Sequence, residues 1–134
     1  MRAWRKWWRV GAAFLVMPAM AAACLAEEPR TFSKRGAYDD VKFELDNAII
    51  ARGLAVSASG DIKGMLDRTG PDVGSTKDVY KAAAYVSFCS AKLSRQLVEA
   101  DPVHAVYCPF VITIYETTGK PGEVVVVYRP LDVR

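Results

Sequence analysis

Two cysteines and one histidine are the side chains of this 134-residue sequence whose types and spacing could support chemistry. Cys89 and Cys108 enclose His104, the only histidine, which lies four residues before Cys108. In an oxidising compartment Cys89 and Cys108 are candidates for a disulfide; buried free thiols and a functional thiol or metal site are the alternatives. As metal ligands, Cys89, Cys108 and His104 are weak candidates, because their spacing matches no known ligand motif and a stable site usually needs three or four ligands.

The common catalytic motifs are missing from the sequence. No Gly-x-Ser-x-Gly nucleophile elbow occurs, and no glycine-rich loop is followed by the Lys-Ser/Thr pair of a phosphate site. Asp61, Asp67, Asp72 and Asp78 recur every five or six residues, a spacing that suits neither a metal loop nor a glycosidase pair, so we interpret them as a solvated surface. The sequence therefore predicts no cofactor and leaves enzyme activity uncertain, with a non-enzymatic role favoured.

The N-terminal residues 1–26 are typical of a cleavable secretory signal peptide. Four basic residues precede an uncharged apolar run from Val10 to Ala26, which ends before Glu27. An uncleaved membrane anchor is the first alternative, although the run is at the lower limit for crossing a bilayer. The second alternative is a lipoprotein box, in which Cys24 would be lipidated. We predict a periplasmic or secreted domain of residues 27–134, with no stable membrane span after cleavage, or a lipid anchor at Cys24.

Removal of this segment changes the charge of the chain. The whole sequence has 18 basic and 15 acidic residues, and four of the basic residues belong to the signal peptide. The domain therefore keeps 14 basic and 15 acidic residues, a net charge of −1. Such a domain lacks the basic surface that nucleic-acid binding requires, so a nucleic acid is not a predicted partner.

Apolar spacing and turn residues predict an α+β domain. Asp61 and Ser90 are expected as helix N-caps and Gly53 as a C-cap residue, and Ile62, Met65 and Leu66 are expected to point inward. The order β-α-β-(α)-β-α-β-β predicts two layers, with helices covering a mainly antiparallel sheet. The predicted strands cover 30–35, 54–59, 82–88, 110–115 and 124–128; the predicted helices cover 38–52, 61–68 and 91–100, with a further helical turn within 76–81.

The last two predicted strands, 110–115 and 124–128, form a hairpin that is apolar on both faces. Helices of a two-layer domain cover only one face of a sheet, and a half-exposed strand would alternate polar and apolar residues. A loop or the tail of the chain could cover the second face. We favour a homodimer through the hairpin sheet, because an exposed apolar patch of this size is rare on a monomer.

Several motifs together resemble the domain of unknown function 302 family, of the exported type with two cysteines. Many members have another residue in place of Cys89 and Leu-Pro in place of Cys108-Pro109, whereas the exported members have both cysteines. The resemblance implies a two-layer α+β fold and is compatible with dimers, but it carries no catalytic residue because the family has no established reaction. The motifs are Phe88-Cys89-Ser90-Ala91-Lys92-Leu93, the segment from Leu97 to Pro102, the segment from Cys108 to Glu116, and Val127-Tyr128-Arg129-Pro130.

Two functions agree with these observations. The first is a non-enzymatic exported domain that dimerises or binds a ligand or protein partner. The second is a periplasmic redox or metal- or haem-handling protein that uses Cys89 and Cys108. The oxidation state of the two cysteines would distinguish a structural disulfide from a redox pair.

Overall fold

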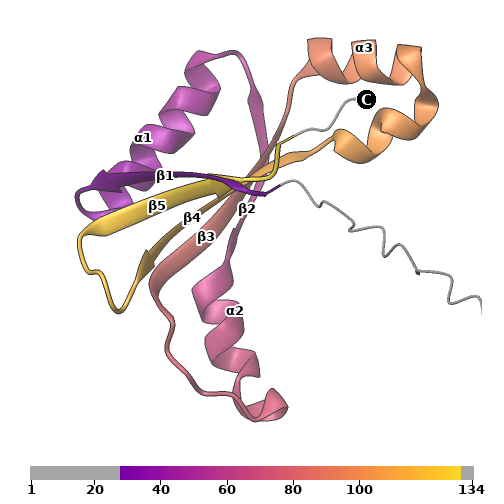
Figure 1. The fold of residues 1–134 in the computed structure, drawn as a ribbon. Helices are drawn as coiled ribbons and strands as arrows, with labels where there is room; N and C mark the ends of the chain where they lie inside the picture. The colour runs from indigo at the N-terminus through magenta and orange to yellow at the C-terminus, as the bar shows by residue number, and fades with distance from the viewer. Residues whose placement is uncertain (1–27, 131–134) are drawn as a thin grey trace, which may run out of the picture.

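A computed structural model describes residues 28–130, in which five strands form one antiparallel sheet with helices packed on it (Figure 1). The predicted signal peptide, including Cys24, lies outside the described residues. Within residues 28–130, no helix combines the length and apolar character that crossing a membrane requires. The strands are β1 (Arg30–Arg35), β2 (Ala55–Asp61), β3 (Tyr80–Cys89), β4 (Phe110–Thr117) and β5 (Glu123–Tyr128); the helices are α1 (Tyr38–Ala51), α2 (Ile62–Thr69) and α3 (Ala91–Ala100), with 3-10 helices η1 (Pro71–Val73) and η2 (Pro102–Tyr107).

The predicted α+β class and the predicted order of elements are confirmed. The strands lie side by side in the order β1-β5-β4-β3-β2, so the first strand of the domain pairs with the last. The β4–β5 hairpin pairs Ile112 with Tyr128 and Ile114 with Val126. This register places Ile112, Ile114 and their partners on one face of the sheet, because residues alternate between the two faces along a strand.

Helix α1 covers the middle of that face. Its buried residues Val41 and Ile49 lie two turns apart, and Val41 packs with Ala84, Ile114 and Val124 in the main hydrophobic cluster. Asp39 and Asp40 occupy the first turn, where carboxylates complement the helix dipole. Gly53 follows the helix with a φ of 71°, a left-handed conformation that favours glycine and ends the helix as expected.

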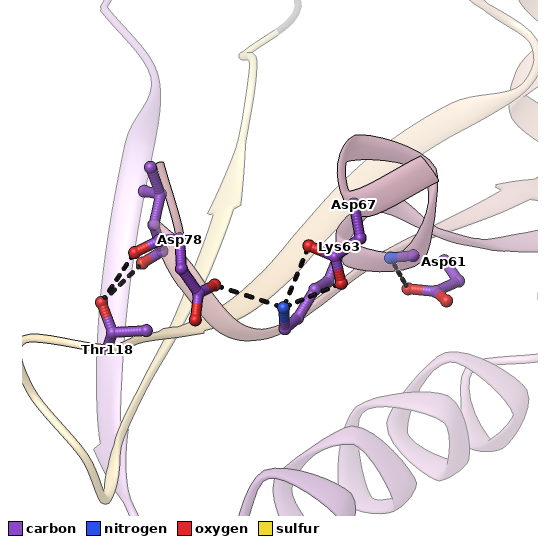
Figure 2. Close-up of polar contacts among 7 residues, drawn as sticks. Asp61, Lys63, Asp67, Asp78 and Thr118 are labelled. Atoms are coloured by element: carbon purple, nitrogen blue, oxygen red, sulfur yellow. Dashed lines mark hydrogen bonds and ion pairs between the residues drawn. The ribbon is translucent and has the colours of Figure 1, made fainter. Parts of the chain in front are cut away.

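Two local predictions are wrong. The helical turn expected within 76–81 does not form, since residues 75–79 are irregular and β3 begins at Tyr80. The Thr118 hydroxyl donates a hydrogen bond to the backbone carbonyl of Asp78 (Figure 2). The backbone N–H of Thr118 donates to the backbone carbonyl of Val79. These bonds hold residues 78 and 79 extended beside β4. Met65 and Leu66 are exposed rather than inward-facing, because α2 continues from the end of edge strand β2.

Three of the four regularly spaced aspartates, Asp61, Asp67 and Asp78, have structural partners. Asp61 caps α2 by accepting a hydrogen bond from the backbone N–H of Gly64 at 2.9 Å. Figure 2 shows the Lys63 ammonium between Asp67 and Asp78, at 2.9 Å and 3.2 Å from their carboxylate oxygens. These hydrogen bonds raise the pKa of Lys63, with that to Asp67 contributing most. The aspartates thus secure α2 and the segment that precedes β3.

Glu116 is the buried acidic residue of the sheet, with 2% of its surface exposed. Its carboxylate accepts a hydrogen bond of 2.7 Å from the backbone N–H of Gly122 and pairs with the Lys81 ammonium at 3.0 Å. The bond from Gly122, and next the one from Lys81, lower the pKa of Glu116. Glu116 therefore ties the β4–β5 turn to the sheet through its ionised form.

We expect Glu116→Gln to lower the free energy of unfolding at neutral pH and to lower it by a smaller amount in acid. A lowered folded-state pKa gives stabilisation that is present above the unfolded pKa of about 4.3 and is lost as the pH falls through the folded pKa. Urea unfolding of wild type and variant from neutral pH downward would show the two free energies of unfolding converging. Glu123→Gln is the matched control, and a Glu116→Gln deficit that stays constant with pH would contradict the assignment.

Candidate functional site

A hollow of about 880 Å³ lies at the end of the sheet where β3 ends and β4 begins. Most of its surface is apolar or aromatic. This volume falls within the range of about 300–1,000 Å³ that is usual for small-molecule sites. The residues that line the hollow are Leu54, Phe88, Ser90, Leu93, Val106, Tyr107, Pro109, Phe110, Val111, Ile112, Tyr128, Arg129 and Pro130.

The floor of the hollow is the part of the sheet that continues past the residues under α1. Phe88 pairs with Phe110 and Ile112 pairs with Tyr128 in the strand ladders, on the face that also carries Ile114. The Phe88 and Phe110 rings lie 5.9 Å apart and tilted, a favourable aromatic geometry. Helix α1 ends at Ala51 and contributes no residue to the lining. On the side of the hollow next to α1, the lining residue is therefore Leu54.

The opposite wall is formed by α3 and η2, which pack mainly against each other and stand beyond the end of the strands (Figure 1). Ser90 caps α3 by accepting from the backbone N–H of Leu93, and Asp101 caps η2 by accepting from that of Val103. Nδ1 of His104 lies 3.1 Å from the carbonyl oxygen of Leu97, which requires Nδ1 to carry the proton and donate. Leu93, Val106 and Tyr107 project from this wall into the lining.

A disulfide between Cys89 and Cys108 closes the base of this wall, with the two Cα atoms 5.7 Å apart. Cys89 is the last residue of β3, and Cys108 precedes β4 by two positions. The bridge therefore holds together the two chain segments that lead into and out of α3 and η2. It adds a covalent link where these helices make few contacts with the sheet.

Of the candidate site residues, the structure brings together Cys89 and Cys108 but gives His104 a separate position. The His104 ring bonds the Leu97 carbonyl oxygen and packs on Tyr107, with ring centroids 5.7 Å apart, and it does not line the hollow. Within residues 28–130, no three His, Cys, Asp or Glu side chains converge as a metal site would require. His104 thus serves to hold η2 against α3.

The polar side chains of the hollow are Ser90, Tyr107, Tyr128 and Arg129. None of the lining residues is acidic, and Arg129 is the one with a formal charge. Three hydroxyls and a guanidinium can all donate hydrogen bonds, so the lining favours a ligand with an acceptor group. Sequence reasoning missed this site: it placed Phe88 and Phe110 at the ends of predicted strands, and an aromatic residue at a strand end does not reveal whether a helix covers it.

Residues 30–133 match the sequence profile of the family "Domain of unknown function DUF302". The chain belongs to this family. The crystal structure of uncharacterized conserved protein DUF302 from Bacillus stearothermophilus is similar, with a TM-score of 0.61 and 10% sequence identity over 75% of this chain and 72% of that chain. At this identity the DUF302 structure supports the fold alone, and no curated protein matches the chain.

The Cys89→Ala/Cys108→Ala double variant should have a lower free energy of unfolding than the wild type. The bridge joins residues 19 apart in sequence, and closure of a loop of this length stabilises a folded chain by about 3 kcal/mol. Denaturant unfolding would measure this loss, and hydrogen exchange should show faster exchange of the α3 amides. Wild type treated with a strong reductant serves as the control. Unchanged stability, or reduction of the bridge at the glutathione poise, would favour a redox pair instead.

Proposed function

We propose that this member of the DUF302 family is an exported, non-enzymatic binding domain whose hollow takes up a small apolar ligand. The observation that carries the proposal is the hollow itself, an apolar and aromatic concavity of about 880 Å³ at the end of the sheet. Sites of this kind bind small molecules by burying their apolar surface, with a few polar groups that set the orientation. Export rests on the N-terminal residues 1–26.

The chemistry of the lining favours binding over catalysis. General acid–base catalysis needs a group whose pKa lies near the working pH, such as histidine or a raised carboxylic acid. The lining contains neither a histidine nor an acidic residue, and the cysteines nearby are joined in a disulfide. Aromatic rings and aliphatic side chains dominate instead, and they stabilise a ligand through the apolar area that it buries.

Val106→Asp should weaken binding of the neutral dye Nile red about tenfold or more, because a carboxylate in the lining would have to be desolvated by the ligand. Val103→Asp is the matched control. Both valines lie on η2 and are largely exposed, at 75% and 67%, but only Val106 lines the hollow. Fluorescence titration measures both affinities. Equal losses in the two variants, or no saturable binding by wild type, would contradict the proposal.

The second candidate is homodimerisation through the face of the sheet opposite α1. The register places Tyr85, Thr113 and Val127 side by side on this face, with Tyr115 and Val125 next to them. Tyr85 is exposed and the other four are half-buried. We call these five residues the apolar strip. A strip that runs across the middle of a sheet can pair with the same strip of a second copy about a two-fold axis.

Thr113→Lys tests the dimer, because Thr113 lies between Tyr85 and Val127 at the centre of the apolar strip. Light scattering after size exclusion should give twice the chain mass for wild type and the chain mass for the variant, since two lysines would meet across the two-fold axis. Asn47→Lys, on an exposed position of α1, is the control and should remain dimeric. A wild-type monomer at micromolar concentration would contradict dimerisation and leave the ligand proposal intact.

A further inference from the structure

The border of the hollow carries one charge, and it is positive. Arg129 follows the last residue of β5, next to Tyr128, and is exposed. Within residues 28–130 its guanidinium forms no ion pair, as holds for most arginines of this region, of which Arg95 pairs with Glu99. No acidic residue lines the hollow. An incoming anion would therefore meet a guanidinium that no lining carboxylate neutralises.

The apolar part of the hollow leads away from this charge. Tyr128 and Ile112 are paired in the ladder next to Arg129, and Phe110 and Phe88 follow along the same face toward the wall formed by α3. The lining is thus cationic and hydroxyl-bearing near Arg129 and apolar from Ile112 to Phe88. A ligand that complements both parts has an anionic head and one apolar tail.

We infer that the ligand is a single-chain amphiphile with a carboxylate head, bound with its tail on the floor of the hollow and its head at Arg129. This inference rests on the proposed function and names the ligand class. Arginine binds a carboxylate through two parallel N–H···O bonds, which is stronger and more directional than a neutral hydrogen bond. The Tyr107 and Tyr128 hydroxyls lie in the same lining and can donate to the head.

The charge of Arg129 argues against two other occupants of the hollow, a second copy of the chain and the N-terminal apolar run. A second copy would bring a domain surface of mixed charge to a concave floor, whereas the apolar strip offers it a sheet face with no charged residue among its five members. The apolar N-terminal run from Val10 to Ala26 contains no acidic residue, so it offers no side-chain anion to Arg129. A carboxylate amphiphile satisfies both the guanidinium and the apolar floor.

Decanoate and decanol, which share a tail and differ in the head, test the inference with the purified chain. Calorimetric titration should show decanoate binding about tenfold more tightly than decanol, and NMR should locate both ligands through shifts of the Leu93, Val106 and Ile112 methyl groups. Arg129→Gln should reduce decanoate affinity about tenfold and leave decanol unchanged, as expected for loss of one charge-assisted contact. Arg35→Gln, on an exposed arginine that does not line the hollow, is the matched control.

The possible outcomes distinguish failure of the inference alone from failure of the proposal on which it rests. Equal affinities of wild type for decanoate and decanol, with shifts at the same methyl groups, would overturn the carboxylate inference and leave the apolar hollow as a ligand site. Equal effects of Arg129→Gln and Arg35→Gln would overturn the placement of the head. Shifts of these methyl groups that depend on protein concentration without ligand would show a second copy in the hollow and overturn both. The absence of binding by either ligand would also overturn both.

Discussion

The length of α1 is the constraint on which the rest of this structure depends. A helix of 14 residues spans about 21 Å, whereas the ten residues of β3 span about 33 Å. Because α1 starts just after Gly36, at the end of the sheet where β1 finishes, its cover stops before the other end of the face. The three most deeply buried side chains, Ile114, Val86 and Val124, belong to the sheet. Past them the face continues with aromatic residues that α1 does not reach.

The elements that border this uncovered end are stabilised in a different way from the core. Helix α3 has no buried residue, and it packs mainly against η2. Its position depends on three local interactions: the Ser90 cap, the hydrogen bond between His104 and the Leu97 carbonyl oxygen, and the disulfide at its base. A wall built from local hydrogen bonds and one covalent link can keep its apolar side facing a hollow without filling it, which a wall held by core packing could not do.

The sequence predicted the elements more completely than it predicted how they fit together. The helix over 38–52 and both N-caps follow from local rules, because apolar spacing and Asp61 or Ser90 act within one or two turns. The extended segment before Tyr80 depends on Thr118, about forty residues away. The hollow is likewise non-local. Its residues come from four separate segments, and their meeting is fixed by strand register and by the length of α1.

The hollow and the apolar strip suit different occupants because their shapes and chemistry differ. The hollow is concave and carries one cation and three hydroxyls that can donate hydrogen bonds, which fits a small molecule with an acceptor, whereas the strip crosses a sheet face and carries no charge. Val111 links the two surfaces: it lines the hollow, yet it alternates with the floor residues and so belongs to the face that carries the strip. A dimer that moved Val111 would change ligand affinity, and the ligand would change dimer affinity by the same factor, since coupling between two sites is reciprocal.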